Sequence, residues 1–218
     1  MEPSETHRWQ EGGTLMIGKL GAYVSVVVTV ATSLIAALML MLGAGAVIYA
    51  GFYDVAATSP HWRMTSWLLE TARIRSIKAQ AAGISAPPGL DDQAKVIIGV
   101  EHYAAHCAVC HGAPGVPKGA MARGLYPPPP NLAKTALLYT PAELFWILRH
   151  GIKMTGMPSW SDHSDDELWA TVGFLEKLPS MSEQDYANLV MASMAHGGHH
   201  DSSNGGNNPR DPDIHEKP

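Results

Sequence analysis

The chain contains only two cysteines, Cys107 and Cys110. A structural zinc site requires about four ligands, and no second cysteine pair is available to complete one. A thioredoxin-like redox pair belongs in a βαβ setting, yet no stretch alternates polar and apolar residues for long enough to predict a strand. The scarcity of cysteine and the lack of a strand pattern therefore argue against both uses of the pair, and they favour an all-α fold.

The sequence also lacks any charged residue from Gly21 to Tyr53. A helix needs about 20 apolar residues to cross a bilayer core, so we predict a transmembrane anchor helix over residues 21–53. A cleaved signal peptide is the alternative, but its apolar region is about 7–15 residues long and follows a basic start. Here the run is longer, and residues 1–20 carry glutamates at positions 2, 5 and 11. An uncleaved anchor is therefore favoured.

The two cysteines belong to the run Cys107-Ala108-Val109-Cys110-His111, which has the spacing of a c-type haem attachment site. If this run is helical, positions i, i+3 and i+4 lie on one face, so both sulfurs and the imidazole point the same way. We predict that Cys107 and Cys110 form thioethers with one covalently bound haem c. His111 then binds the haem iron from one side.

A second axial ligand to the iron is expected from the part of the chain after His111. The stretch from Gly151 to Trp160 is the strongest source, because its glycines allow the backbone to fold close to the haem and Pro158 holds the preceding residue extended. We predict that Met157 is the ligand, with Met154 as the second choice. The other candidates are Met121, His150 and His163, and the two histidines are interpreted as surface or packed side chains.

Between the anchor and the haem motif, residues 54–90 are predicted to form a juxtamembrane helix and a linker. The helix is expected over residues 59–82, with Ser59 as its cap and Pro60 in its first turn. Its tryptophans are interleaved with basic residues, a mixture that suits a membrane interface or a partner surface. The alternative is a helix that only packs on the domain that follows.

Residues 91–192 are predicted to form the haem domain, which is an ordinary size for one domain. Helical spacing of apolar residues recurs through it, and four helix starts are expected. They are Asp91 or Asp92, the capping box Thr140-Pro141-Ala142-Glu143, Ser164 or Asp162, and Ser182. Gly151 is expected to close the second of these helices, and Pro179 the third.

These motifs together resemble a membrane-anchored, class I (monohaem) cytochrome c of bacteria. The resemblance rests on Gly99 and Tyr103, on the haem motif, on Pro130-Asn131-Leu132, on Met157-Pro158 and on Leu168-Trp169 with Phe174-Leu175. It implies a small helical fold in which the first helix crosses the last near Gly99 and Tyr103. It also implies that the Pro130 carbonyl accepts a hydrogen bond from the nitrogen of His111 that does not bind iron.

An iron bound by both His111 and Met157 has no open position for a substrate. We therefore expect an electron carrier rather than an enzyme, since a peroxidase or a sensor needs a vacant or labile sixth site. The leading hypothesis is a carrier of single electrons in a bacterial respiratory chain, with redox proteins or membrane oxidoreductase complexes as partners. The alternative is a haem c subunit of a larger dehydrogenase or oxidase complex, docked through residues 59–82.

Basic residues flank the apolar run on both sides, so the positive-inside count does not decide its orientation. Bacterial proteins of the kind that this chain resembles acquire haem outside the cytoplasm. We therefore expect residues 1–20 in the cytoplasm and the haem domain in the periplasm, anchored to the inner membrane by one span.

Residues 193–218 are rich in Gly, Asn, Asp and Pro, and we expect them to be a disordered tail. His196, His199 and His200 lie close together there and could bind copper, nickel or zinc weakly. This pattern supports a third hypothesis, a copper-handling protein that uses the tail. The alternative is a plain polar tail.

Overall fold

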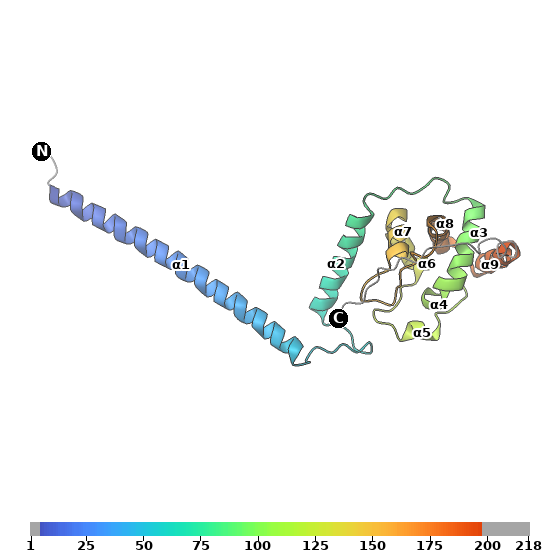
Figure 1. Cartoon of the computed structure of the whole chain (residues 1–218), viewed down its shortest axis with the longest axis horizontal. Helices are drawn as coiled ribbons and strands as arrows, with labels where there is room; N and C mark the ends of the chain where they lie inside the picture. Colours follow the sequence, from blue (N-terminus) through green and yellow to red (C-terminus); the bar gives the residue numbers. More distant parts are fainter. Residues whose placement is uncertain (1–4, 198–218) are drawn as a thin grey trace, which may run out of the picture. The chain divides into compact units, whose positions relative to one another are not determined.

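The computed structural model describes residues 5–197, and the chain divides after Val55 into two compact units. The first unit contains α1 (Glu5–Tyr49), and the second contains the remaining helices (Figure 1). Between residues 5 and 197 all regular structure is helical, and no strand occurs. The predicted all-α fold is confirmed.

The first unit holds a helix, Gly21–Tyr49, that is long and apolar enough to cross a membrane. α1 begins at Glu5, within the predicted polar segment 1–20, because polar residues such as Glu, Gln and Arg are good helix formers. It ends at Tyr49 rather than at residue 53. Gly51 adopts a φ of 74°, and the N–H of Phe52 donates to the carbonyl of Val47 at 3.1 Å. These are the features of a Schellman motif, which closes the helix.

The second unit is built from short helices joined by irregular segments. They are α2 (Arg63–Ala81), α3 (Gln93–His102), α4 (Ala108–His111), α5 (Ala120–Arg123), α6 (Leu132–Thr135), α7 (Pro141–His150), α8 (Asp165–Lys177) and α9 (Glu183–Gly197). A π-helical turn, Tyr103–Cys107, joins α3 to α4, and 3-10 turns occupy Ala136–Leu138 and Leu178–Ser180.

Two of the predicted helix starts are capping boxes. Thr140 accepts from the N–H of Glu143, whose carboxylate accepts from the N–H of Thr140, and Pro141 occupies the first turn of α7. Ser164 and Glu167 form the same reciprocal pair at the start of α8. Both predictions are confirmed, because a capping box depends only on residues within one turn of the helix.

Two other predicted starts were wrong in detail. α2 begins at Arg63 with no side-chain cap, so neither the cap at Ser59 nor the helical turn at Pro60 forms. Instead the N–H of His61 donates to the hydroxyl of Tyr126 at 3.0 Å, a tertiary contact that holds this segment extended. At α3, Asp92 occupies the capping position but its side chain makes no capping hydrogen bond.

The centre of the second unit is the crossing of α3 and α8, which make the most extensive contact between helices there (Figure 1). A Cβ on Gly99 would lie 2.1 Å from the carbonyl oxygen of Ala170, so the two backbones touch at this glycine. Tyr103 packs on Phe174 with ring centroids 5.0 Å apart, and Phe145 stacks on Trp169 at 4.2 Å. The crossing near Gly99 and Tyr103 that the resemblance implied is present.

α2 packs on α7 through its C-terminal half, where Ile77 and Ala81 are buried. Arg73 donates to the hydroxyl of Tyr139 at 2.6 Å. The N-terminal half differs, because Trp67 and Leu68 are 64% and 60% exposed. The helix therefore packs on the haem domain, as the simpler alternative predicted, and it also presents an apolar surface.

α9 continues to Gly197, beyond residue 193, where we placed the start of the tail. The reason is tertiary packing, since Tyr186 and Ser193 are buried and α9 contacts α3. The side chains of His196, His199 and His200, predicted as weak metal ligands, lie outside the described residues.

Candidate haem site

The predicted haem motif lies where α3 passes through the π-helical turn Tyr103–Cys107 into α4. The motif was expected as helix, and this is correct except that Cys107 belongs to the π turn. Single π turns inside α-helices occur frequently at functional sites. The hydroxyl of Tyr103, fully buried, donates to the carbonyl of Gly112 at 2.5 Å. This bond ties the start of the π turn to the residue that follows α4.

The two cysteines present thiols of different exposure. Cys107 is buried and Cys110 is half-buried, and the two do not form a disulfide. Burial, with a smaller contribution from Cys110, raises the pKa of the Cys107 thiol to about 12. Because neither sulfur is part of a disulfide, both are available for covalent attachment of a group.

His111 has one ring nitrogen engaged and the other available. Its Nδ1 lies 2.9 Å from the carbonyl oxygen of Pro130, the contact that the resemblance implied. Burial is the main cause that lowers the pKa of His111, although the bond to Pro130 opposes the shift. A neutral imidazole with Nδ1–H bonded to a carbonyl presents Nε2 as a metal ligand in a fixed orientation.

The proline run is itself held in place by a lysine. Lys118 Nζ donates to the carbonyl of Pro129, directly before the residue that bonds His111. Asn131 caps α6 by accepting from the N–H of Ala133 at 3.0 Å. These two contacts fix the Pro130 carbonyl from both sides.

The segment that carries Met157 is a tight loop between α7 and α8. The N–H of Ile152 donates to the carbonyl of Met157 at 3.1 Å. Thr155 Oγ1 donates to the carbonyl of Ile152 at 2.7 Å and accepts from the N–H of Met157 at 3.1 Å. Gly151 adopts a φ of 64°, and a Cβ there would lie 2.6 Å from the backbone of Pro158. Only glycine allows this loop to close.

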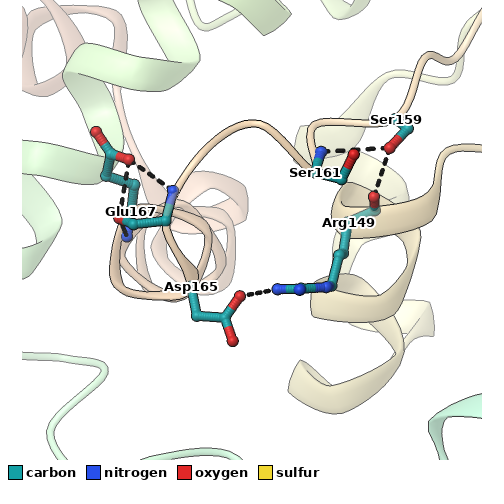
Figure 2. Close-up of polar contacts among 6 residues, drawn as sticks. Arg149, Ser159, Ser161, Asp165 and Glu167 are labelled. Atoms are coloured by element: carbon teal, nitrogen blue, oxygen red, sulfur yellow. Dashed lines mark hydrogen bonds and ion pairs between the residues drawn. The ribbon is translucent and has the colours of Figure 1, made fainter. Parts of the chain in front are cut away.

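Polar contacts attach the end of this loop to α7, and an ion pair joins α7 to α8 (Figure 2). Ser159 Oγ donates to the carbonyl of Arg149 at 2.7 Å and accepts from the N–H of Ser161 at 3.2 Å. The guanidinium of Arg149 pairs with Asp165 at the start of α8. The backbone around Met157 is thus fixed by hydrogen bonds on both sides.

The other candidate axial ligands are placed differently. Met157 is partly buried and packs against the hydrophobic core that includes Cys107. Met154 and Met121 are 75% and 70% exposed. His150 is exposed at the end of α7, whereas His163 lies against two other histidines.

A comparison with protein families identifies the kind of domain that contains this site. Residues 94–175 match the family model described as "Cytochrome C oxidase, cbb3-type, subunit III". This part of the chain is a class I c-type cytochrome domain. No curated protein matches the chain. The cytochrome domain carries covalently bound haem c and has an electron-transfer role.

The residues present fit this cofactor. Two thiols on one helical segment can form two thioethers, and His111 offers a neutral nitrogen held by Pro130. A Cβ on Gly156 would lie 2.7 Å from a methyl carbon of Leu125, so the Met157 loop approaches the chain closely. Two thiols and an imidazole are the groups that attachment of a c-type haem requires, and a methionine thioether is the second iron ligand in cytochromes c with His/Met ligation.

Sequence reasoning missed the hydrogen bonds by which two residues, Lys118 and Tyr103, support this site from a distance. Lys118 and Tyr103 act through carbonyl oxygens, and no short motif marks such contacts. The pair His102 and His106 was also missed, although two histidines four residues apart lie on one helical face.

Proposed function

We propose that this protein is a membrane-anchored carrier of single electrons in a bacterial respiratory chain. In this proposal Cys107 and Cys110 hold the haem, and His111 and Met157 are the two axial ligands of its iron. When bound, haem c supplies a one-electron couple. The protein's part is to fix both axial ligands so that little rearranges when an electron enters or leaves.

The hydrogen bond between His111 Nδ1 and the Pro130 carbonyl carries this proposal. It commits one nitrogen of the ring to the protein and leaves the other for a metal. An outer-shell bond of this kind orients the ring and increases its basicity as a ligand. Met157 comes from a separate and equally fixed loop. Two preformed ligands favour a closed iron centre, which suits a carrier rather than a catalyst.

The proposed location is the inner membrane, with α1 as the single span and the cytochrome domain in the periplasm. Support comes from the length and composition of Gly21–Tyr49 and from the attachment of haem outside the cytoplasm in the bacterial cytochromes that the chain resembles. A carrier tethered in this way exchanges electrons with redox proteins or complexes of the same membrane.

Replacing Met157 by alanine tests the proposed ligation. The ferric variant should lose the near-infrared methionine-to-iron band. Because axial ligands set haem potentials over a range of about 0.8 V, and His/Met ligation raises the potential, the midpoint potential should fall by on the order of 0.1 V or more. Visible and near-infrared spectra and a redox titration of the full-length protein in detergent provide the measurements.

Met154→Ala is the matched control, because Met154 lies on the same loop and is 75% exposed. It should keep both the band and the potential. A Met157→Ala protein with an unchanged band would contradict the assignment. A wild-type protein that lacks the band and binds carbon monoxide readily when reduced would favour a sensor or an enzyme instead.

A second candidate function is a fixed haem c subunit of a larger membrane oxidoreductase. Two observations favour it. The matching family model is named for an oxidase subunit, and the N-terminal half of α2 exposes Met64, Trp67 and Leu68 at 77%, 64% and 60%. Exposed apolar groups of this kind are typical of interaction surfaces.

Gentle detergent extraction followed by size-exclusion chromatography separates these two functions. For a carrier, we expect the chain to elute without stoichiometric partners. A stoichiometric complex that is lost in the variant Trp67→Ala/Leu68→Ala, but retained in Lys78→Ala, would establish the subunit role instead. Lys78 is exposed on the same helix, so its replacement controls for changes in α2 itself.

A further inference from the structure

His102 on α3 is a buried histidine with an unsatisfied nitrogen. It is 8% exposed, and its Nε2 has no hydrogen-bond partner among the described residues. Buried polar atoms in native proteins nearly always have a partner, and each exception needs an explanation. The surroundings of His102 supply one.

Two further histidines lie against His102. His106 follows it by four residues on the same helical face, and His163 comes from the loop that leads into α8. Ring centroids are 4.8 Å apart for His102 and His106, 4.4 Å for His102 and His163, and 5.5 Å for His106 and His163. One ring nitrogen from each residue can be chosen so that all three lie within 4.8 Å of one another. Three nitrogen donors thus converge from two segments of the chain.

Glu167 and Ser164 make polar contacts behind the histidine cluster. His163 Nδ1 faces the carboxylate of Glu167 at 3.9 Å. Ser164 holds that carboxylate through its N–H at 2.9 Å and its hydroxyl at 2.8 Å. A carboxylate behind a histidine is the usual arrangement around metal-binding imidazoles, because it orients the ring and leaves the other nitrogen for the ion.

Trp160 covers the cluster. Its ring centroid lies 5.7 Å from His102, 5.2 Å from His106 and 5.6 Å from His163. The indole therefore shields the three imidazoles from water on one side. An apolar shell of this kind limits solvent access to a metal site and lowers the local dielectric constant.

The protonation of His102 also suits a metal. Burial is the largest cause that lowers its pKa to about 4, and the nearby His163 and His106 lower it further. Its imidazole is therefore neutral near pH 7, which is the form that binds metal ions.

We propose that His102, His106 and His163 bind one divalent late-transition-metal ion. Imidazole donors suit zinc, copper and nickel, whereas magnesium and calcium require oxygen ligands. Nitrogens that share one ion at about 2.0–2.1 Å lie about 3–3.5 Å apart, so the three rings need to approach one another slightly. His106 is exposed and His163 is half-buried, so both can rotate inward.

This site uses none of the proposed haem ligands and none of the histidines of the tail. It joins α3, just before the haem motif, to the segment just after the Met157 loop. An ion bound there cross-links the two parts of the chain that carry the proposed axial ligands. We therefore expect metal binding to stabilise the haem domain, whatever the axial ligation of the iron.

Zinc is the probe, because it has no redox reaction with haem. The full-length holoprotein in detergent is first treated with a chelator and then exposed to ZnCl2 and desalted. Bound zinc and iron are measured by mass spectrometry, and the melting temperature is followed with and without zinc. Wild type should retain one zinc ion per haem. The variants His106→Asn and His163→Asn should lose this zinc ion. The melting temperature of wild type should rise by on the order of 10 °C at zinc 100-fold above Kd.

Two controls identify the source of any bound zinc. His150→Asn removes an exposed histidine on α7 that is outside the cluster, and His196→Asn/His199→Asn/His200→Asn removes those of the tail. Both should keep the site-specific zinc and the rise in melting temperature. Equal zinc retention and an equal rise in wild type, His106→Asn and His163→Asn would overturn the proposal, as would loss of both effects in the tail variant. The metal-free melting temperature and haem spectrum of His106→Asn and His163→Asn should match wild type, which excludes misfolding as the cause.

Discussion

Replacing both Cys107 and Cys110 by alanine should remove covalently bound haem from the protein entirely. No other cysteine exists in the chain, so no alternative thioether can form. The loss should extend to the fold, because a group that binds only the folded state stabilises that state, and a domain of this size is only marginally stable. Haem staining of a denaturing gel and the absorption spectrum of the purified protein measure the effect.

The two single cysteine variants distinguish the loss of haem attachment from the loss of folding. Cys110→Ala and Cys107→Ala each leave one thiol, so each should retain some covalent haem, with an absorption band shifted by the unreacted vinyl group. Cys107→Ala should be the less stable of the two, because Cys107 is buried and Cys110 is half-buried. A haem-stained band from the double variant would contradict the assignment of these cysteines.

Local signals predicted most of the framework around the haem. The capping boxes at Thr140 and Ser164 mark the starts of α7 and α8 because every atom involved lies within one turn of the helix. Gly151 likewise marks the end of α7 through its own backbone conformation, with a φ of 64°. The haem motif is equally local, because its spacing is set by one turn of helix.

Predictions failed where a distant residue decides the local structure. α2 begins later than Ser59 because the backbone of His61 bonds to Tyr126, which is far away in the sequence. α9 extends further than predicted because Ser193 is buried, and a serine gives no sign of this in the sequence. The cluster of His102, His106 and His163 needs the crossing of α3 and α8 before its members meet. Sequence alone could have suggested only the pair on one helix.

A second large effect on stability is expected at the crossing of α3 and α8. Replacing Gly99 by alanine would place a Cβ 2.1 Å from the carbonyl oxygen of Ala170 and 2.9 Å from the Cβ of Phe174. Neither atom is the end of a flexible side chain, so the helices must separate. Such overpacking costs about 1–3 kcal/mol or more. The 2.1 Å approach to a backbone oxygen places the cost at the upper end of this range, and the better helix propensity of alanine returns about 1 kcal/mol, so the net loss should be about 2 kcal/mol.

Gly83→Ala is the control, because a Cβ at Gly83 meets no atom within 4 Å and its backbone φ is not positive. Thermal melting followed by haem absorbance should show a melting temperature lower by several degrees for Gly99→Ala and near wild type for Gly83→Ala. Gly99→Ala should retain covalent haem, because both cysteines remain. Equal melting temperatures would mean that α3 and α8 can separate at no cost. In that case the close backbone contact at Gly99 would not contribute to the stability of the haem domain.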